Sequence, residues 1–181
     1  SVATTKAYST QLIAAYTLAI QFAMVRGTIT EEACSNYISE LQTLPDKICK
    51  ILEDKERIQW FASKQANVKD AFFVGRGIDY AISLEGSLKM KEISYIHSEA
   101  YAAGELKHGT ISLIEDGTLV IGVLTQPDLY EKTVSNMVEC KSRGAYLMGL
   151  TTFGNYNNRG YRRLHRLHPE NRLALLQHPW Q

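Results

Sequence analysis

The first third of the chain has a hydrophobic pattern that predicts helices and no strand. Apolar residues between positions 12 and 23 recur three and four residues apart, which is the helical period, and Gly27 follows as a stop signal. A second helix is expected to begin after Thr30 and to end at Pro45, because proline lacks the N–H that a helix interior needs. Two shorter helical segments are expected to follow, up to residue 66.

After residue 70 the pattern changes to short, uniformly apolar runs that alternate with longer stretches compatible with helices. Strands are expected at residues 71–74, 119–124 and 145–150, and helices at residues 80–96 and from Pro127 to about residue 143. Strands that are apolar on both sides are typical of a parallel sheet buried between helices. The sequence therefore predicts an α/β fold in which a mainly parallel sheet is flanked by helices and preceded by a helical segment.

Ligands of such sheets bind at the carboxyl ends of the strands, and one motif of this chain falls there. The segment Gly75-Arg76-Gly77 directly follows the first expected strand. Its glycines allow the backbone to approach an anion closely, although two glycines after a strand do not identify that anion.

Composition and charge are those of an ordinary globular protein. The 181 residues are 45% hydrophobic and 22% charged, with a formal net charge of +1, so the overall balance favours neither nucleic acid nor an anionic membrane as a partner. No apolar run approaches the roughly 20 residues that a membrane-spanning helix needs. The three cysteines have no CxxC or metal-ligand spacing, which favours reduced thiols of a cytoplasmic protein without a metal or cofactor. The first residues have neither a Met nor a signal-peptide layout, so we expect an interior piece of a longer protein.

The densest group of ionisable residues lies between positions 84 and 109. Glu85 and Lys89 are four residues apart, and Lys89 and Glu92 are three apart, so on a helix all three side chains share one face. One interpretation is a surface ion-pair ladder, in which each pair contributes roughly a few tenths of a kcal/mol. The other is a carboxylate held beside a cation near a pocket, where a desolvated carboxylate can move a proton between adjacent carbons.

Two histidines follow this cluster in the sequence. His108 stands in the glycine-flanked segment 104–109, which is typical of a loop, and there it could pass protons to a hydroxyl group or a ring oxygen near neutral pH. His97 is instead expected to continue the helix as a packed or capping residue.

The end of the chain differs from the rest in composition. Residues 158–181 carry five arginines against one acid, and their apolar positions fit neither a helix nor a strand. A nucleic-acid-binding arm is one interpretation. The other is a change of reading frame near Asn157, because a permitted codon choice read one nucleotide later encodes IEDTADFTVYIP, an acidic linker leading into an apolar strand.

Several motifs of this chain, taken together, resemble one family. They are LEGSLKMKEISYIHSEAY at residues 84–101, GELKHG at 104–109, FVGRG at 73–77 and VATTKAYSTQ at 2–11, and they occur in the family's order. Over about residues 1–157 the chain resembles the sugar isomerase (SIS) region of the glutamine–fructose-6-phosphate aminotransferases, the glucosamine-6-phosphate synthase family. It departs from the family pattern at Thr110, where proline is usual, and at Thr4, where serine is usual.

The resemblance implies an SIS-type three-layer sandwich and a reaction. In that reaction fructose 6-phosphate and glutamine-derived ammonia become glucosamine 6-phosphate by ketose–aldose isomerisation. Glu92 would move the proton between C1 and C2, and Lys89 would orient it or stabilise charge beside it. Val2 and Thr4 would contact the substrate. His108 would assist ring opening in the site of a neighbouring subunit, so that a homodimer shares its sites.

The resemblance also implies how the chain is divided and what it lacks. Residues 1–66 are expected to be the closing helix of a first SIS subdomain plus connecting helices, residues 67–157 an incomplete second subdomain, and residues 158–181 an atypical basic tail. The family's glutaminase domain, its phosphate-holding loop and its lysine-bearing C-terminal tail are missing. We therefore expect the 181-residue chain alone to have little or no synthase activity. The alternative function is a non-catalytic SIS module of a regulator that binds a sugar phosphate, which has no need of a proton-transfer carboxylate at position 92.

Overall fold

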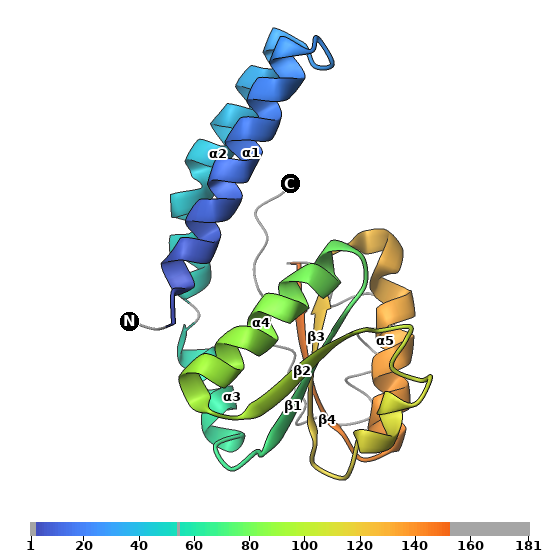
Figure 1. Ribbon diagram of the computed structural model, residues 1–181. Coiled ribbons are helices and arrows are strands. Elements are labelled where there is room, and N and C mark those ends of the chain that lie inside the picture. The colour runs from blue at the N-terminus through green and yellow to red at the C-terminus, as the bar shows by residue number, and fades with distance from the viewer. Residues whose placement is uncertain (1–2, 54, 153–181) are drawn as a thin grey trace. The chain divides into compact units, whose positions relative to one another are not determined.

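The computed structural model describes residues 3–53 and 55–152, and these fall into two compact units that meet in the sequence at residues 53 and 54. The first unit is a pair of helices, and the second holds a sheet with its own covering helices (Figure 1). Each unit is described by itself below.

The first unit is a helical hairpin. Helix α1 spans Thr5–Val25 and helix α2 spans Glu31–Leu52, and the two helices contact each other. The Thr30 side chain caps α2, because its Oγ1 accepts a hydrogen bond from the Ala33 N–H at 3.1 Å. No residue of either helix is buried. The expected helices are present, but their apolar side chains form no closed core within this unit.

Helix α2 corrects one prediction of the sequence analysis. Pro45 does not end the helix but lies inside it, and the helix continues to Leu52. Proline removes one N–H of the helix and leaves the carbonyl four residues earlier without that donor. The cost is offset by the neighbouring turns, which remain helical on both sides, so the two segments predicted separately are one helix.

The second unit contains a four-stranded sheet in which all neighbouring strands are parallel. In chain order its elements are α3 (Lys55–Lys64), β1 (Asp70–Gly75), α4 (Ile78–Ser94), β2 (His97–Ala102), a 3-10 helix (Thr110–Leu113), β3 (Leu119–Leu124), α5 (Pro127–Ser142) and β4 (Tyr146–Thr151). The strand order across the sheet is β2-β1-β3-β4. The three strands predicted from apolar runs are confirmed as β1, β3 and β4, and the α/β fold class is confirmed with them.

Helices cover both faces of this sheet, as its uniformly apolar strands require. Phe72 of β1 belongs to the core cluster on the α5 side, together with Tyr130 and Met137 of α5. Its neighbour Phe73 points the other way, into the cluster that includes Phe61 of α3. The result is three layers with the sheet in the middle (Figure 1).

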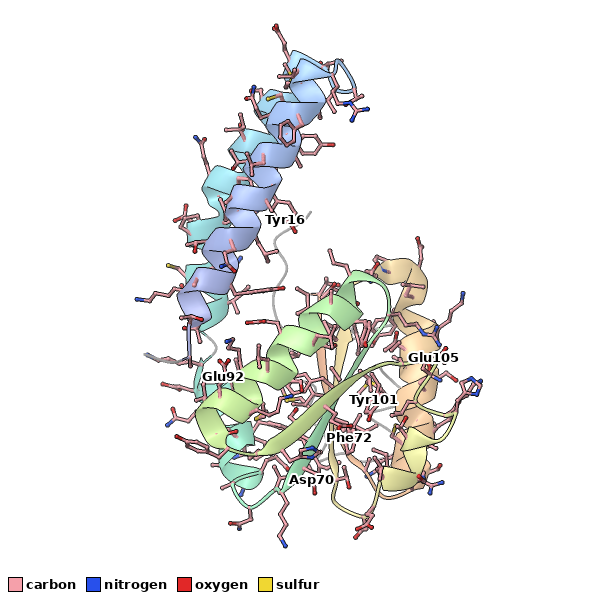
Figure 2. The ribbon with its side chains drawn as sticks, in the orientation of Figure 1. Tyr16, Asp70, Phe72, Glu92, Tyr101 and Glu105 are labelled. Atoms are coloured by element: carbon pink, nitrogen blue, oxygen red, sulfur yellow. The ribbon has the colours of Figure 1, made fainter. Side chains whose placement is uncertain are left out.

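Strand β2 was not predicted, and the expectation for His97 is wrong. Helix α4 ends at Tyr95, which adopts the left-handed conformation with φ of 59°, and β2 begins at His97. The His97 ring is exposed and lies 3.0 Å from Asp70 through Nδ1. Further along this edge strand, the Tyr101 ring stacks on Phe72 (Figure 2). Three consecutive polar residues at the start of β2, at positions 97–99, concealed this strand in the sequence, because an edge strand of a sheet need not be apolar.

The two interpretations of the basic tail, a nucleic-acid-binding arm and a change of reading frame, concern residues outside the described ones. Within the described part of the chain, no helix has the length and hydrophobicity of a transmembrane span.

Candidate functional site

Helix α4 carries the candidate catalytic residues and packs on the sheet through its smallest side chains. Ser83 and Ser87 are buried, and Gly86 lies against Phe73, where a Cβ would fall 2.9 Å from the ring. The helix therefore approaches the sheet closely at Gly86, while Met90, one turn further on, packs against the core on this face. Leu84 and Leu88 are exposed instead. The outer side of α4 therefore combines ionisable groups with exposed apolar side chains.

The predicted cluster of Glu85, Lys89 and Glu92 forms on this helix. The Lys89 ammonium donates a hydrogen bond to Glu92 Oε2 at 2.5 Å and lies 3.5 Å from Glu85 Oε1. All three side chains are largely covered, with exposed fractions of 21% for Glu85, 19% for Lys89 and 26% for Glu92. The three charges sum to −1, so the cluster keeps one negative charge that Lys89 does not balance.

Electrostatics keep Lys89 in its charged form. The hydrogen bond to Glu92 raises the pKa of Lys89, and the negative charges of Glu92 and Glu85 add to this effect against the opposing desolvation. The ammonium is therefore a permanent cation near neutral pH. It fixes one oxygen of the Glu92 carboxylate, while Oε1 accepts no hydrogen bond from any residue that the structure describes. That oxygen is available to take up a proton.

His108 lies in the turn region after β2, far from this cluster within the same unit. Its N–H donates to the Glu105 carbonyl at 3.0 Å, and its side chain is exposed. Glu92 lies 14 residues along α4 from Ile78, which is on the order of 20 Å from the end of the helix that follows β1. The parallel strand β2 then returns the chain to the carboxyl edge of the sheet. Figure 2 accordingly shows Glu92 and Glu105 on opposite sides of the unit. One copy of the unit does not bring Glu92 and His108 together.

The two predicted substrate-contacting residues belong to the first unit. Thr4 occupies the N-cap position of α1, but its exposed side chain makes no capping hydrogen bond. Its carbonyl accepts hydrogen bonds from the N–H groups of Ala7 and Tyr8. Val2 lies outside the described residues.

The carboxyl edge of the sheet, where Gly75-Arg76-Gly77 was expected to face a ligand, is bridged by the chain's own side chains. The strand order reverses direction between β1 and β3, and this is where such sheets form a crevice. Buried Asp79 accepts hydrogen bonds from the Thr125 N–H at 2.9 Å and from the Thr125 hydroxyl at 2.5 Å. Gln126 Nε2 donates to the Arg76 carbonyl at 2.6 Å. Asp79 and Gln126 were not predicted as site residues, although an acid in the first turn after Gly-Arg-Gly was a usable signal in the sequence.

The described residues offer no set of ligands for a metal ion. Within residues 3–53 and 55–152, no three His, Cys, Asp or Glu side chains are placed to hold one.

The fold agrees with the comparison with protein families. The model of the SIS domain matches residues 65–157, a region that holds all four strands and the covering helices α4 and α5. The chain belongs to the SIS domain family.

More specific relatives are found among curated proteins and solved structures. The glutamine–fructose-6-phosphate aminotransferase (isomerizing) of Caldanaerobacter subterraneus is 56% identical over 160 residues, which is 88% of this chain and 26% of that protein. The enzyme of the same name from Clostridium tetani is 55% identical over 157 residues, 87% of this chain and 26% of its own length. The C-terminal domain of glucosamine-fructose-6-phosphate aminotransferase from Francisella tularensis superposes with a TM-score of 0.85 at 31% identity, covering 97% of this chain and 47% of that chain. The resemblance stated from the motifs is confirmed, and the chain spans about a quarter of the length of these curated relatives.

Proposed function

We propose that this chain is part of the isomerase domain of a glutamine–fructose-6-phosphate aminotransferase, which forms glucosamine 6-phosphate from fructose 6-phosphate and glutamine-derived ammonia. The similarity to enzymes of that name supports the reaction. The observation that carries the proposal is the 2.5 Å hydrogen bond between Lys89 and Glu92, which leaves one carboxylate oxygen without a partner among the described residues. A surface ion-pair ladder would explain the bond but not the covered state of all three side chains.

In the proposed reaction Glu92 is the base. Its free oxygen takes a proton from C1 of the open sugar and returns it to C2, which converts a ketose skeleton into an aldose skeleton with no net change in protonation of the enzyme. Lys89 orients the carboxylate through Oε2, and its fixed positive charge offsets negative charge that develops on the adjacent substrate oxygen. Because the pKa of Lys89 is raised, that positive charge persists across the neutral range.

The site needs a second copy of the chain. Figure 2 places Glu92 and Glu105, three residues before His108, at opposite sides of one unit, and we propose that His108 assists ring opening in the site of its neighbour within a homodimer. The exposed Leu84, Leu88 and Ile93 beside the cluster support this arrangement, because a partner surface would bury them.

The remaining parts of the proposal concern the substrate contacts, the division of the chain and its setting. Val2 and Thr4 contact the sugar phosphate. Residues 1–66 close a first subdomain and connect it to the second subdomain at residues 67–157. The enzyme works in the cytoplasm without a metal or cofactor, and neither nucleic acid nor membrane is its partner. The free thiols of Cys34, Cys49 and Cys140 are compatible with that compartment.

The test restores the missing segments and then removes the base. Residues 1–157 are grafted in place of the matching region of the Caldanaerobacter relative, and Glu92→Gln is compared with Glu115→Gln, an exposed control. We expect Glu92→Gln to abolish isomerisation while glutamine hydrolysis and fructose 6-phosphate binding remain. Unchanged isomerisation would remove Glu92 from the mechanism. Retained sugar binding without turnover in the unsubstituted graft would favour the non-catalytic regulatory module instead.

A mixing experiment tests the shared site. In the proposal the Glu92→Gln graft is inactive and the His108→Ala graft is strongly impaired, but a mixed dimer has one site with both native side chains. Random mixing in equal amounts should therefore restore about a quarter of the native activity. No recovery, with mixed dimers demonstrated by differential tags, would show that each site draws both residues from one chain.

A further inference from the structure

The loop that carries His108 is fixed to the sheet at few points. The Ala103 N–H donates to the Gly75 carbonyl at 2.9 Å, and Ala103 and Leu106 are buried. The hydrogen bonds of the following turns are local to the segment, such as the His108 N–H to the Glu105 carbonyl. The orientation of the loop therefore depends on what lies beneath its first residues.

The Arg76 side chain lies beneath Gly104 in this loop. A Cβ at Gly104 would fall 2.9 Å from Arg76 Nη2, 3.2 Å from Nη1 and 3.3 Å from the guanidinium carbon, so the flat group rests against the glycine backbone. Gly104 is not in the left-handed region, so a side chain at this position would meet the Arg76 guanidinium and no backbone strain. A Cβ at Gly104 would require the guanidinium to move from its place against the loop.

The guanidinium is held in place by a distant helix and by no acid. Its Nη2 donates to Asn136 Oδ1 of α5 at 2.8 Å, across 60 residues of sequence. Its Nε is buried without a hydrogen-bond partner, and no carboxylate of the described residues forms an ion pair with it. The planar guanidinium can donate to Asn136 from one edge while its other atoms lie against Gly104, which a lysine ammonium could not do in the same way. The Arg76 carbonyl is meanwhile fixed by Gln126, which ties the β1 end to the start of α5.

We propose that Arg76 is a positioning residue for the loop of residues 103–109, and that through Gly104 it sets the place of His108 at the neighbour's site. This inference rests on the proposed function only for the role of His108. The contact between Arg76 and Gly104 is a property of the chain itself, and it can be tested without any activity.

The first experiment measures amide hydrogen exchange in the 181-residue chain. Arg76→Lys should accelerate exchange of the Glu105, His108 and Ile111 amides about tenfold, while amides of β3 and of the first unit are unchanged. Arg143→Ala, at the exposed end of α5, is the control and should change none of them. Equal acceleration throughout the second unit would mark Arg76 as a general stabiliser and overturn the proposal.

The second experiment is a double-mutant cycle. Gly104→Ala should accelerate exchange of the same amides, and adding it to Arg76→Ser should have no further effect, because the serine leaves room for the new methyl group. Additive effects would mean that Gly104 does not rest on the guanidinium. If Arg76→Ser does not fold, the cycle is run with Arg76→Lys. The lysine ammonium is narrower than the guanidinium, so Gly104→Ala should then accelerate amide exchange less than it does in the native background.

The third experiment separates positioning from general structure in the grafted enzyme. Arg76→Lys should lower kcat for fructose 6-phosphate about tenfold with little change in KM. When it is added to the His108→Ala variant, kcat should not fall below that of His108→Ala alone. Equal losses in both backgrounds would contradict action through His108. If His108→Ala itself leaves kcat unchanged, the proposed role of His108 fails, while the exchange experiments still decide whether Arg76 positions the loop.

Discussion

Two regions of the second unit are built in opposite ways. The cluster of Glu85, Lys89 and Glu92 is local, because residues three and four apart on one helix meet wherever that helix forms. The carboxyl edge is non-local, because Arg76 finds its partners at Gly104 and Asn136, which only the folded sheet brings near. Helical spacing therefore predicts which ionisable side chains meet on α4, whereas the contacts at the carboxyl edge depend on the tertiary fold.

The largest expected effect falls on activity at the local cluster. Lys89→Met in the grafted enzyme should lower kcat about a hundredfold, because the carboxylate loses the cation that orients it and offsets substrate charge. Lys91→Met, on the same helix but exposed, is the matched control. Thermal unfolding of the two variants should be nearly equal. Equal activities would show that the pair is only a surface ladder.

The next effect falls on stability at the carboxyl edge. Asp79→Asn should lower the free energy of unfolding by about 1–3 kcal/mol. The buried carboxylate accepts hydrogen bonds from the N–H and the hydroxyl of Thr125, and in the variant an amide NH₂ group, which cannot accept, would face one of these donors. Asp128→Asn in the exposed first turn of α5 is the control, and urea unfolding is the measurement. If both variants unfold alike, the Asp79 bridge does not stabilise this edge, and the contrast between the two regions weakens.

A smaller effect is a pH dependence at strand β2. The hydrogen bond to Glu99 and burial raise the pKa of Tyr101 to about 12. In the unfolded chain the tyrosine pKa is about 10, so the unfolded chain loses this proton at a lower pH than the folded chain does. The contribution of Tyr101 to the free energy of unfolding is therefore complete below about pH 10 and decreases between about pH 10 and 12. Urea unfolding of the native chain and of Tyr101→Phe between pH 8 and 11.5 should give stability curves that converge above pH 10. Parallel curves would contradict the assigned hydrogen bond.

The smallest effect is expected from the outer member of the local cluster. Glu85→Gln removes only the 3.5 Å contact and should change the free energy of unfolding by about 0.5 kcal/mol or less. Activity of the graft should stay within about twofold, because Lys89 and Glu92 remain paired. A loss as large as that of Lys89→Met would instead make Glu85 a third essential member of the cluster.

Local patterns of residues were enough to predict several elements of this protein and one of its clusters. Uniformly apolar runs predicted β1, β3 and β4, and helical spacing placed Lys89 between two carboxylates on α4. Prediction from the sequence failed where the folded structure departs from a local preference, such as that of proline to end a helix. Pro45 is retained inside α2, and the left-handed Tyr95 ends α4 so that His97 begins a polar edge strand.

The positions of these elements and side chains relative to one another follow from the folded sheet and could not be predicted from local patterns. Parallel pairing of β2 with β1 sends His108 to the edge of the unit away from Glu92, and the same pairing lays Gly104 on Arg76. These relations join residues distant in sequence, and a pattern of neighbouring side chains contains no information about them. They follow from the packing of α4 and α5 on opposite faces of one sheet.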